Sequence, residues 1–515
     1  MVKYKKTVFG IFIAIFILFG INVGINAWIK SQLPSIINKE NDSSYIITYK
    51  NLEVSLFTRT IFAENIAIVP KESSKDLLVN KGIYAKVKSV EVKGVSLWNL
   101  ILSNKLKANA IEITKPKIII YEKDKERFVE NSVVAPFEKI IKVKTIVLKN
   151  GDLKLMSNEE DTPILSIQNI NFKVDGILIT DAVLKKKNPL EYKNYALTCD
   201  SLFYHPNSFY NLKTKKVAIT NANIEVANFE MIPMFPRKEF VSKLKYEEDI
   251  FTLLCKSISF RNSDWGFNKD DFFFHTKSII LEEMTANIYR SKIPADDLTK
   301  KYLYNKLLRD LKLDLKVDSL KIRNSKLVYE EEKSFQLGAG ILSFDKFNLT
   351  ATNVASGFKK TKLPDVKIAI DCKFMNKSPF HVNWNFNVLD KSDGFTIRGK
   401  LNNFETEQMN AFTKPYLNIT SKGVLDEVRF KFSGNDLKSS GNFALKYDNL
   451  DVVIYQKDTR KKKNKVLSFI ANLFVKKDSD EKVKDVNVEV ERIQEKSFYN
   501  FLWMNVAEGL KKILI

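Results

Sequence analysis

Strict alternation of apolar and charged residues is the feature that most constrains how this chain folds. One stretch, residues 310–318, separates its apolar side chains by single aspartates and lysines; these apolar residues are Leu311, Leu313, Leu315 and Val317. Successive side chains of a β-strand point to opposite faces of a sheet, so this pattern predicts a strand with one apolar face and one charged face. Because similar alternation recurs from about residue 45 to residue 455, we expect that region to consist mainly of antiparallel strands.

A second pattern, eleven residues long, occurs five times without gaps. Each copy has apolar residues at its second, fourth, ninth and eleventh positions, and four copies have Asn at the sixth. The copies are AIEITKPKIII (110–120), TIVLKNGDLKL (145–155), KVAITNANIEV (216–226), SISFRNSDWGF (257–267) and SLKIRNSKLVY (319–329). Asn tolerates the left-handed backbone that tight turns require, so we interpret each copy as a β-hairpin. Chance similarity between unrelated hairpins is the alternative.

These patterns predict a mainly β fold: an N-terminal transmembrane helix, then an elongated, curved antiparallel β-sheet with a few short helices. The helices are expected at 96–104, within 294–310, and twice near the C-terminus. An apolar sheet face can be covered by another layer of the same protein, or it can curl into a groove that binds hydrocarbon. Alternation alone leaves both possibilities open. If a groove forms, the candidate lining residues are Ile111, Ile113, Ile118, Leu311, Leu313, Leu315 and Val317.

The N-terminal segment is long and apolar enough to be a membrane anchor. Residues 8–29 contain no charged side chain, and 22 residues of helix reach about 33 Å, against a hydrocarbon core of about 30 Å. A cleavable signal peptide is the alternative, although its apolar stretch is usually only about 7–15 residues long. Because Lys3, Lys5 and Lys6 precede the helix, we expect a single-pass inner-membrane protein with a cytoplasmic N-terminus and a periplasmic body.

The chain is strongly basic, with a formal net charge of +22. Such a charge favours anionic partners, and a periplasmic body makes an anionic envelope lipid a better candidate than nucleic acid. A basic segment leads into a predicted amphipathic helix near residues 466–474, and it could dock on an anionic membrane surface. The alternative, which the sequence supports equally well, is a helix that packs against the end of the sheet. The membrane-surface candidates are Arg460, Lys461, Lys462, Lys463 and Lys465. A second apolar stripe, from Phe498 to Leu514, predicts a terminal helix that caps the last strands.

Several short motifs make the chain resemble a known family. They are YKNLEVSL (49–56), VSLWNL (95–100) and IEITKPKI (111–118) near the start, and KLNNF (400–404), GVLDEV (423–428), FSGN (432–435) and KSFYNFLW (496–503) near the end. With its N-terminal anchor, the chain resembles AsmA-like envelope proteins of the Bacteroidota type, which are related to repeating β-groove lipid-transfer proteins. The resemblance implies an inner-membrane-anchored periplasmic β-groove that takes part in outer-membrane lipid supply or envelope homeostasis. It implies no catalytic residue.

Catalytic and metal-binding signatures are missing from the sequence. The three histidines, His205, His275 and His381, are isolated, and no HExxH, P-loop or GxSxG motif occurs. The three cysteines, Cys199, Cys255 and Cys372, form no CxxC pair, although one distant disulfide could form. We therefore expect no enzyme activity, no cofactor and no metal site.

The expected organisation has four sections. They are an anchor (1–30), an N-terminal AsmA-like groove section (31–160), a central groove section (161–390) and a C-terminal section with the basic and terminal helices (391–515). The expected function is binding of phospholipid acyl chains, which assists lipid transport to the outer membrane or envelope homeostasis. The alternative is a structural or assembly factor that contacts other envelope proteins and carries no lipid.

Overall fold

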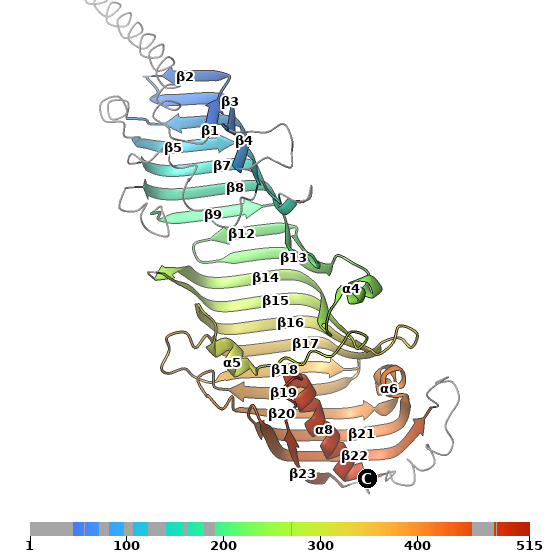
Figure 1. Cartoon of the computed structure of the whole chain (residues 1–515). Helices are drawn as coiled ribbons and strands as arrows, with labels where there is room; N and C mark the ends of the chain where they lie inside the picture. Colours follow the sequence, from blue (N-terminus) through green and yellow to red (C-terminus); the bar gives the residue numbers. More distant parts are fainter. Residues whose placement is uncertain are drawn as a thin grey trace, which may run out of the picture. The chain divides into compact units, whose positions relative to one another are not determined.

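The structure is a computed structural model that describes residues 45–55, 57–71, 82–96, 107–121, 141–157, 163–179, 191–268, 270–455, 478–479 and 482–514. Strands account for 67% of these residues, in a long mixed sheet with few helices (Figure 1). The fold is therefore mainly β, as the alternation predicts. Among the described residues no helix combines the length and apolarity that a membrane crossing needs. The predicted anchor, residues 8–29, lies outside them, as do the helix predicted at 466–474 and the basic residues 460–465.

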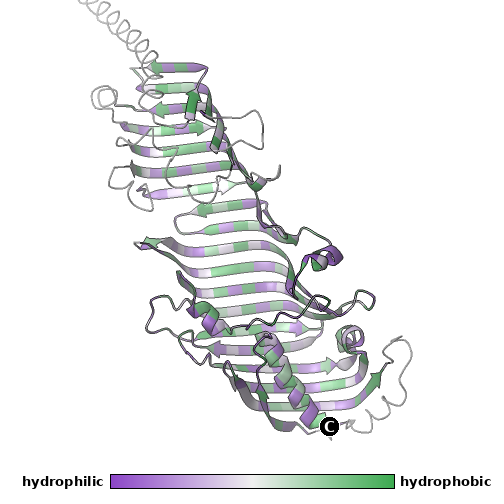
Figure 2. Ribbon diagram, viewed as in Figure 1, coloured by the Kyte–Doolittle hydropathy of each residue, from purple (hydrophilic) through white to green (hydrophobic). Residues whose placement is uncertain are grey.

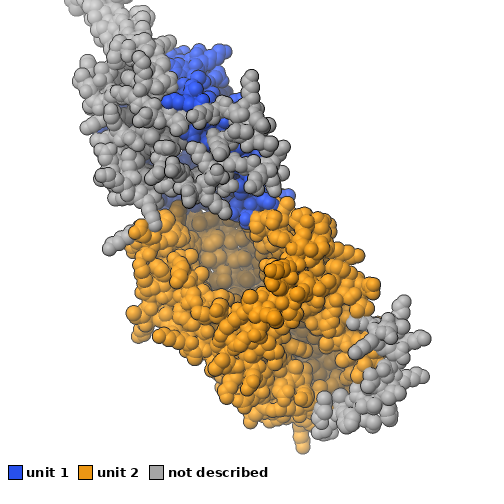
Figure 3. Space-filling model, in the orientation of Figure 1, with its two compact units in different colours: residues 1–206, 213–221 blue, residues 207–212, 222–515 orange. Residues whose placement is uncertain are grey.

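The chain divides into two compact units, coloured separately in Figure 3. Unit 1 comprises residues 1–206 and 213–221, and unit 2 comprises residues 207–212 and 222–515. The section boundaries expected at residues 160 and 390 each fall between two strands that pair with each other. The expected organisation into four sections stays a prediction.

Unit 1 is built from short strands followed by two long ones. Its strands are β1 (Tyr45–Thr48), β2 (Asn51–Ser55), β3 (Thr60–Pro70), β4 (Gly82–Lys93), β5 (Lys107–Thr114), β6 (Lys117–Tyr121), β7 (Ile141–Met156), β8 (Pro163–Ile179), β9 (Asn194–Cys199) and β12 (Lys216–Thr220), with most of β10 (Ser201–Asn207). The strand β11 (Tyr210–Thr214) is shared between the two ranges. Strands β1 and β2 both pair with β3, which pairs with β4. Strand β7 pairs with β8, and β8 with β9 and β10.

Unit 2 is a sheet in which each strand pairs with the next along the chain. Its strands are β13 (Ile224–Pro233), β14 (Asp249–Asn268), β15 (Asp271–Ser291), β16 (Asp314–Glu332), β17 (Gly340–Ala355), β18 (Val366–Phe374), β19 (Ser378–Phe386), β20 (Phe395–Glu405), β21 (Ile419–Gly434), β22 (Lys438–Ile454) and β23 (Lys484–Glu491). Its helices are α4 (Arg237–Lys243), α5 (Tyr304–Arg309), the 3-10 turn η3 (Thr406–Met409), α6 (Asn410–Leu417) and α8 (Phe498–Leu514). Helix α8 confirms the predicted terminal helix, and α5 occupies only the end of the helix predicted within 294–310.

The sheet is mixed, whereas the sequence predicted antiparallel strands only. In unit 1, β5 and β6 both run parallel to β7, and in unit 2 β15 runs parallel to β16. A parallel pair needs a long crossover connection, because the chain must return to the end from which it started. Residues 292–313, which contain α5, supply that connection between β15 and β16. They include Leu311 and Leu313, so the strand predicted from Leu311 begins only at Asp314.

The hairpin interpretation of the eleven-residue repeat is wrong. The copies at 145–155, 257–267 and 319–329 each lie inside a single continuous strand, namely β7, β14 and β16. The copy at 110–120 spans β5 and β6, and both of these pair with β4 and β7 rather than with each other. The copy at 216–226 spans β12 and β13, which pair with β9 and β14 respectively. The repeat therefore marks one strand that is interrupted in its middle.

The asparagine at the sixth position of the repeat nevertheless has a structural role in three of the copies. Asn150, Asn262 and Asn324 adopt left-handed backbone conformations, with φ of 54°, 50° and 47°. In β16 the register with β17 shifts between Ile322 and Ser325, on either side of Asn324, which marks a β-bulge. Side-chain amides satisfy backbone groups beside it: the Asn324 N–H donates to Asn348 Oδ1 over 3.0 Å. Such bulges bend a strand and increase its twist, so the repeat encodes curvature rather than chain reversal.

Candidate apolar groove

One face of the unit 2 sheet is apolar along two adjacent rows of paired residues. We call the face on which α8 packs the helix face, and the other the outer face. Trp384 on β19 lies on the helix face, because its ring stacks on Phe498 of α8. From Trp384 and its row neighbour Val382, the strand register leads through β18, β17, β16, β15 and β14 to β13. We call the residues of these rows on β13–β18 the apolar stripe; they are Ile224, Phe260, Ile279, Leu320, Ala351 and Ile368 in one row, and Val226, Ile258, Leu281, Ile322, Leu349 and Ile370 in the other.

The apolar stripe is less buried than the continuation of the same rows. All stripe residues are half-buried except Ala351, which is buried. Further along the rows, on β19–β22, Ile397 is 3% exposed, Phe432 1% and Phe443 0%. The change coincides with α8, which lies in front of these later strands (Figure 1). Figure 3 shows that unit 2 is hollowed on this side, at the level of the earlier strands. The stripe is therefore the candidate floor of an apolar groove.

The outer face of the same strands is charged, so the two faces of the sheet differ in chemistry. Arg261 on β14 forms an ion pair with Glu225 on β13, and Arg323 on β16 pairs with Glu282 on β15 over 3.1 Å. These residues alternate with stripe residues along each strand, and Figure 2 shows the alternation as bands of hydrophobic and hydrophilic residues. Charged side chains on the outer face keep that face in water. Among the described residues, Ile368 and Ile370 of these apolar rows pack against the core that α8 covers, and the rows continue beyond that core over β13–β17.

Helices α5 and α8 close the groove at β19. The Tyr304 ring of α5 lies 5.2 Å from the Trp384 ring, and the Phe498 ring of α8 lies 4.7 Å from it on a parallel plane. Burial raises the pKa of Tyr304 well above its usual range, and the neighbouring Tyr499 hydroxyl acts in the same direction. On α8, Gly509 fits against the ring of Phe443, where a Cβ atom would overlap the ring. The groove is thus sealed at this end by close packing.

An ionic cluster fastens the crossover and the start of α8 to each other. The carboxylate of Glu247 is 3% exposed and accepts hydrogen bonds from the ammonium groups of Lys292 and Lys496. Lys496 also reaches Asp296 over 3.1 Å, and the hydrogen bond to Glu247 raises the pKa of Lys496. The cluster therefore holds the crossover and the segment before α8 in one arrangement.

Of the four residues that the sequence nominated in unit 2, only Leu315 and Val317 lie on a strand of the stripe, β16. Leu315 pairs with Phe274, whose ring is 5.9 Å from that of Phe260, so Leu315 extends the apolar surface. Val317, by contrast, is buried at 4% exposure. Leu311 and Leu313 lie in the crossover and belong to no strand.

In unit 1 the nominated residues belong to a comparable set of rows. Ile111 pairs with Val92 and Ile146, and Ile113 pairs with Val90 and Leu148, so these two side chains share a face. Ile118 lies beyond the interruption at Lys115, where φ is 49°, and pairs with Ala85 and Leu153. All three nominated isoleucines are half-buried.

None of the residues of the apolar stripe was nominated from the sequence, although the repeat contains the signal. The second and fourth positions of two copies are Ile258 with Phe260 and Leu320 with Ile322, and all four belong to the stripe. The ninth and eleventh positions of a third copy are Ile224 and Val226, which also belong to it. The repeat positions therefore mark the groove floor. Ile279, Leu281 and Leu349 fall outside every copy, and no pattern distinguished them from other strand residues.

Reactive groups are few near the groove. The three cysteines are free and buried, so the distant disulfide that the sequence allowed does not form. Burial raises the pKa of the Cys372 thiol to about 12, and the negative charges of Asp371 and Asp345 act in the same direction. Within the described ranges no three His, Cys, Asp or Glu side chains are grouped so that they could hold a metal ion.

Comparison with known proteins adds no relative. No protein-family model matches the chain, and no curated protein matches it either. The geometry of the groove therefore carries the functional conclusion.

Proposed function

We propose that this protein binds phospholipid acyl chains along the apolar stripe and assists lipid transport to the outer membrane or envelope homeostasis. The observation that supports this proposal is the change in burial along two continuous rows of apolar residues. Among the described residues, the rows are buried beneath the protein's own helix at β19–β22 and, apart from Ala351, are only half-buried at β13–β18. An acyl chain lying on the stripe would supply the missing layer.

The dimensions of the stripe suit a membrane lipid. It crosses the strands from β13 to β18, and at about 4.8 Å between neighbouring strands its length is about 24 Å. One leaflet of a bilayer contributes about half of a 30 Å hydrocarbon core, or about 15 Å. A single acyl chain can therefore lie fully within the stripe. Relative to water, each fully buried CH₂ group would contribute about 0.8 kcal/mol, so apolar contact alone favours the stripe for a chain that has left the bilayer.

The proposed location follows from the N-terminal residues. An uncleaved helix at 8–29 would anchor the chain in the inner membrane, with the three preceding lysines in the cytoplasm and the body in the periplasm. The anchored body would then stand where lipids leave the inner membrane.

Site-specific photo-crosslinking tests the proposal. A photoreactive residue placed at Leu320 lies in the stripe, while one at Lys321, the next residue of β16, lies on the outer face. The full-length protein would be irradiated in the producing cells, purified, and analysed by mass spectrometry for phospholipid adducts. We expect adducts at Leu320 and none above background at Lys321.

Two outcomes would contradict the proposal. Equal adduct yields at the two positions would indicate non-specific contact with lipid, and no adduct at Leu320, or at a second stripe position such as Ile279, would indicate that lipid does not occupy the groove. In parallel, Leu320→Glu should lower the amount of co-purified phospholipid, whereas Lys321→Glu should leave it unchanged. A Leu320→Glu variant that unfolds would leave the crosslinking comparison to decide.

A further inference from the structure

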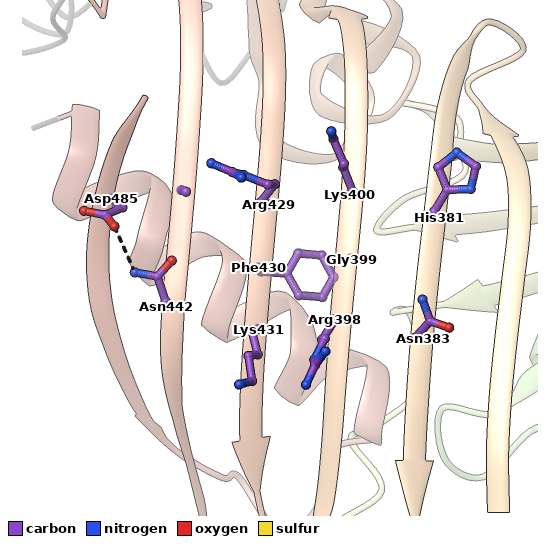
Figure 4. Close-up of a pocket in the computed structure, with 11 residues that line it drawn as sticks. His381, Asn383, Arg398, Gly399, Lys400, Arg429, Phe430, Lys431, Asn442 and Asp485 are labelled. Atoms are coloured by element: carbon purple, nitrogen blue, oxygen red, sulfur yellow. Dashed lines mark hydrogen bonds between the residues drawn. The ribbon is translucent and has the colours of Figure 1, made fainter. Parts of the chain in front are cut away.

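The outer face of unit 2 carries a shallow basic hollow, on the side of the sheet opposite to the groove. Its volume is about 410 Å³, and it lies over β19–β23. Four cationic side chains from the two central strands line it, and they are Arg398 and Lys400 of β20 and Arg429 and Lys431 of β21. Figure 4 shows these side chains in front of the strands, with α8 behind the strands.

A glycine and a phenylalanine form the floor of the hollow, because glycine has no side chain and the phenylalanine ring lies on the other face of the sheet. Gly399 and Phe430 are paired residues of β20 and β21, and both are buried on the helix face. The Phe430 ring covers Gly399, where a Cβ atom would overlap it. No side chain of these two residues therefore projects between the cations, and a small ligand can approach the backbone there.

The cations form two rows that differ in how far they are neutralised. In one row, Lys400 and Arg429 both pair with the carboxylate of Glu427, over 3.0 and 2.9 Å. In the other row, Arg398 pairs in register with Lys431, and neither forms an ion pair with a described residue. This second row thus presents about two uncompensated positive charges.

Amide groups flank the uncompensated row on both sides. Asn383 of β19 is the register partner of Arg398, and Asn442 of β22 is the register partner of Lys431. The two cations and the two flanking amides are all exposed, and each of these four side chains can donate hydrogen bonds. Asn442 also donates to Asp485 of β23 over 3.4 Å, and this carboxylate lines the hollow as well.

We propose that this hollow binds a phosphate monoester group. Such a group carries about −1.5 to −2 charges and three acceptor oxygens, which matches two uncompensated cations flanked by amide donors. The guanidinium of Arg398 can engage two of the oxygens at once, and Lys431 adds a point charge. A carboxylate carries a single charge and would leave one of the two cations uncompensated. Because the hollow and the apolar stripe occupy opposite faces of the sheet, this site is independent of the groove.

Calorimetric titration of the full-length protein in detergent with inorganic phosphate tests the proposal. We expect saturable binding by the wild-type protein and at least about tenfold weaker binding by Arg398→Gln/Lys431→Gln, since charge-assisted hydrogen bonds are lost. A matched control is Lys367→Gln/Lys391→Gln, which removes the same net charge from exposed positions outside the hollow. It should bind phosphate within about twofold of the wild type.

A third variant tests the sign of the electrostatic effect. Glu427→Gln releases Lys400 and Arg429 from their shared carboxylate, so it should bind phosphate several-fold more tightly. Absence of saturable binding by the wild type would overturn the proposal, and so would equal losses in the two double variants, because equal losses report net charge alone.

A soluble lipid analogue distinguishes the two sources of a phosphate monoester. Dihexanoyl phosphatidic acid, used below its micelle concentration, would be compared with inorganic phosphate on the same variants. If Arg398→Gln/Lys431→Gln removes a binding component that is tighter for the analogue, the ligand is a lipid headgroup. Equal affinities for the two probes assign the site to a soluble phosphate ester, and both results support the site itself.

Discussion

The indole ring of Trp384 on β19 stacks on the phenyl ring of Phe498 on α8, with centroids 4.7 Å apart and planes inclined by 10°. This contact marks the point at which the apolar rows of unit 2 pass from the open groove to the covered core. Ile368, the register partner of Trp384 on β18, is only half-buried, whereas Trp384 is 9% exposed. The terminal helix, together with α5, therefore determines where the covered part of these rows ends.

Replacing Phe498 by Ala should loosen this closure. Phe498 is 5% exposed and also contacts the rings of Tyr304 and Phe395, so its removal leaves a cavity and should lower the free energy of unfolding by about 3–5 kcal/mol. Urea unfolding, followed by tryptophan fluorescence, would measure the change. Trp503→Ala is the matched control on the same helix, because Trp503 is 47% exposed, and we expect it to cost less than about 1 kcal/mol. Equal losses would contradict close packing at Phe498.

The left-handed backbone at the Asn324 bulge predicts which substitutions this position tolerates. Asn324→Gly should be nearly neutral, because glycine adopts a φ of 47° without strain. Asn324→Val should lower the free energy of unfolding by more than about 1–2 kcal/mol, because a β-branched residue is disfavoured there. Thr350→Val in β17, where the backbone is extended, is the control and should be tolerated. If the two substitutions at Asn324 had equal effects on the urea midpoint, the bulge would not require that backbone conformation.

The buried thiols should be inert in the native protein. Burial raises the pKa of Cys199, Cys255 and Cys372, the last to about 12, so the reactive thiolate is scarce at mildly alkaline pH. We expect slow labelling by a disulfide reagent in buffer and rapid labelling of all three thiols in guanidinium chloride. Cys372→Ser should lower the number of thiols labelled in guanidinium chloride by one. Rapid labelling of the native wild type would show that one of these strands opens readily.

The contact between Arg237 on α4 and Glu330 on β16 predicts an acid-sensitive contribution to stability. The guanidinium donates two hydrogen bonds to the carboxylate, of 2.8 and 2.6 Å. Burial acts to raise the pKa of Glu330, but hydrogen bonds from Arg237 and Asn287 outweigh it, so the pKa lies below its ordinary value of 4.5. A lowered pKa in the folded state means that the stabilisation is fully present above pH 4.5 and is lost as the pH falls through the folded value.

Unfolding of wild type and Glu330→Gln across this pH range would measure the effect. At neutral pH the wild type should be more stable by about 1–2 kcal/mol, a value reduced because the guanidinium is half exposed. The difference should shrink as the pH falls below 4.5. A difference that stayed constant with pH would mean that the charge of Glu330 contributes nothing.

The repeat shows how far the sequence could predict the groove. Alternation identified Leu320 and Ile322 as apolar neighbours on one face, because side-chain direction along a strand follows from the backbone itself. Asn324 was correctly associated with left-handed backbone. Its interpretation as a turn was wrong, because a hairpin and a bulge place the same demand on that residue and differ only in which strand lies next to it. The neighbours of β16 are β15 and β17, and the parallel pairing with β15 depends on a crossover that no local pattern revealed.

By itself, the sequence of this protein determined that the body is mainly β, which residues share a face, and where the backbone bends. These properties are local, since they depend on a period of two and on the conformational range of single residues. Only the tertiary structure decided which faces are covered. Ile368 and Trp384 belong to the same row, yet Trp384 stacks on Phe498 of α8 and is 9% exposed, whereas Ile368 is only half-buried. That difference arises because the terminal helix, which packs on the adjacent strand β23 and on β22, also reaches β19, far from it in sequence, and no local pattern determines how far along the sheet the helix extends.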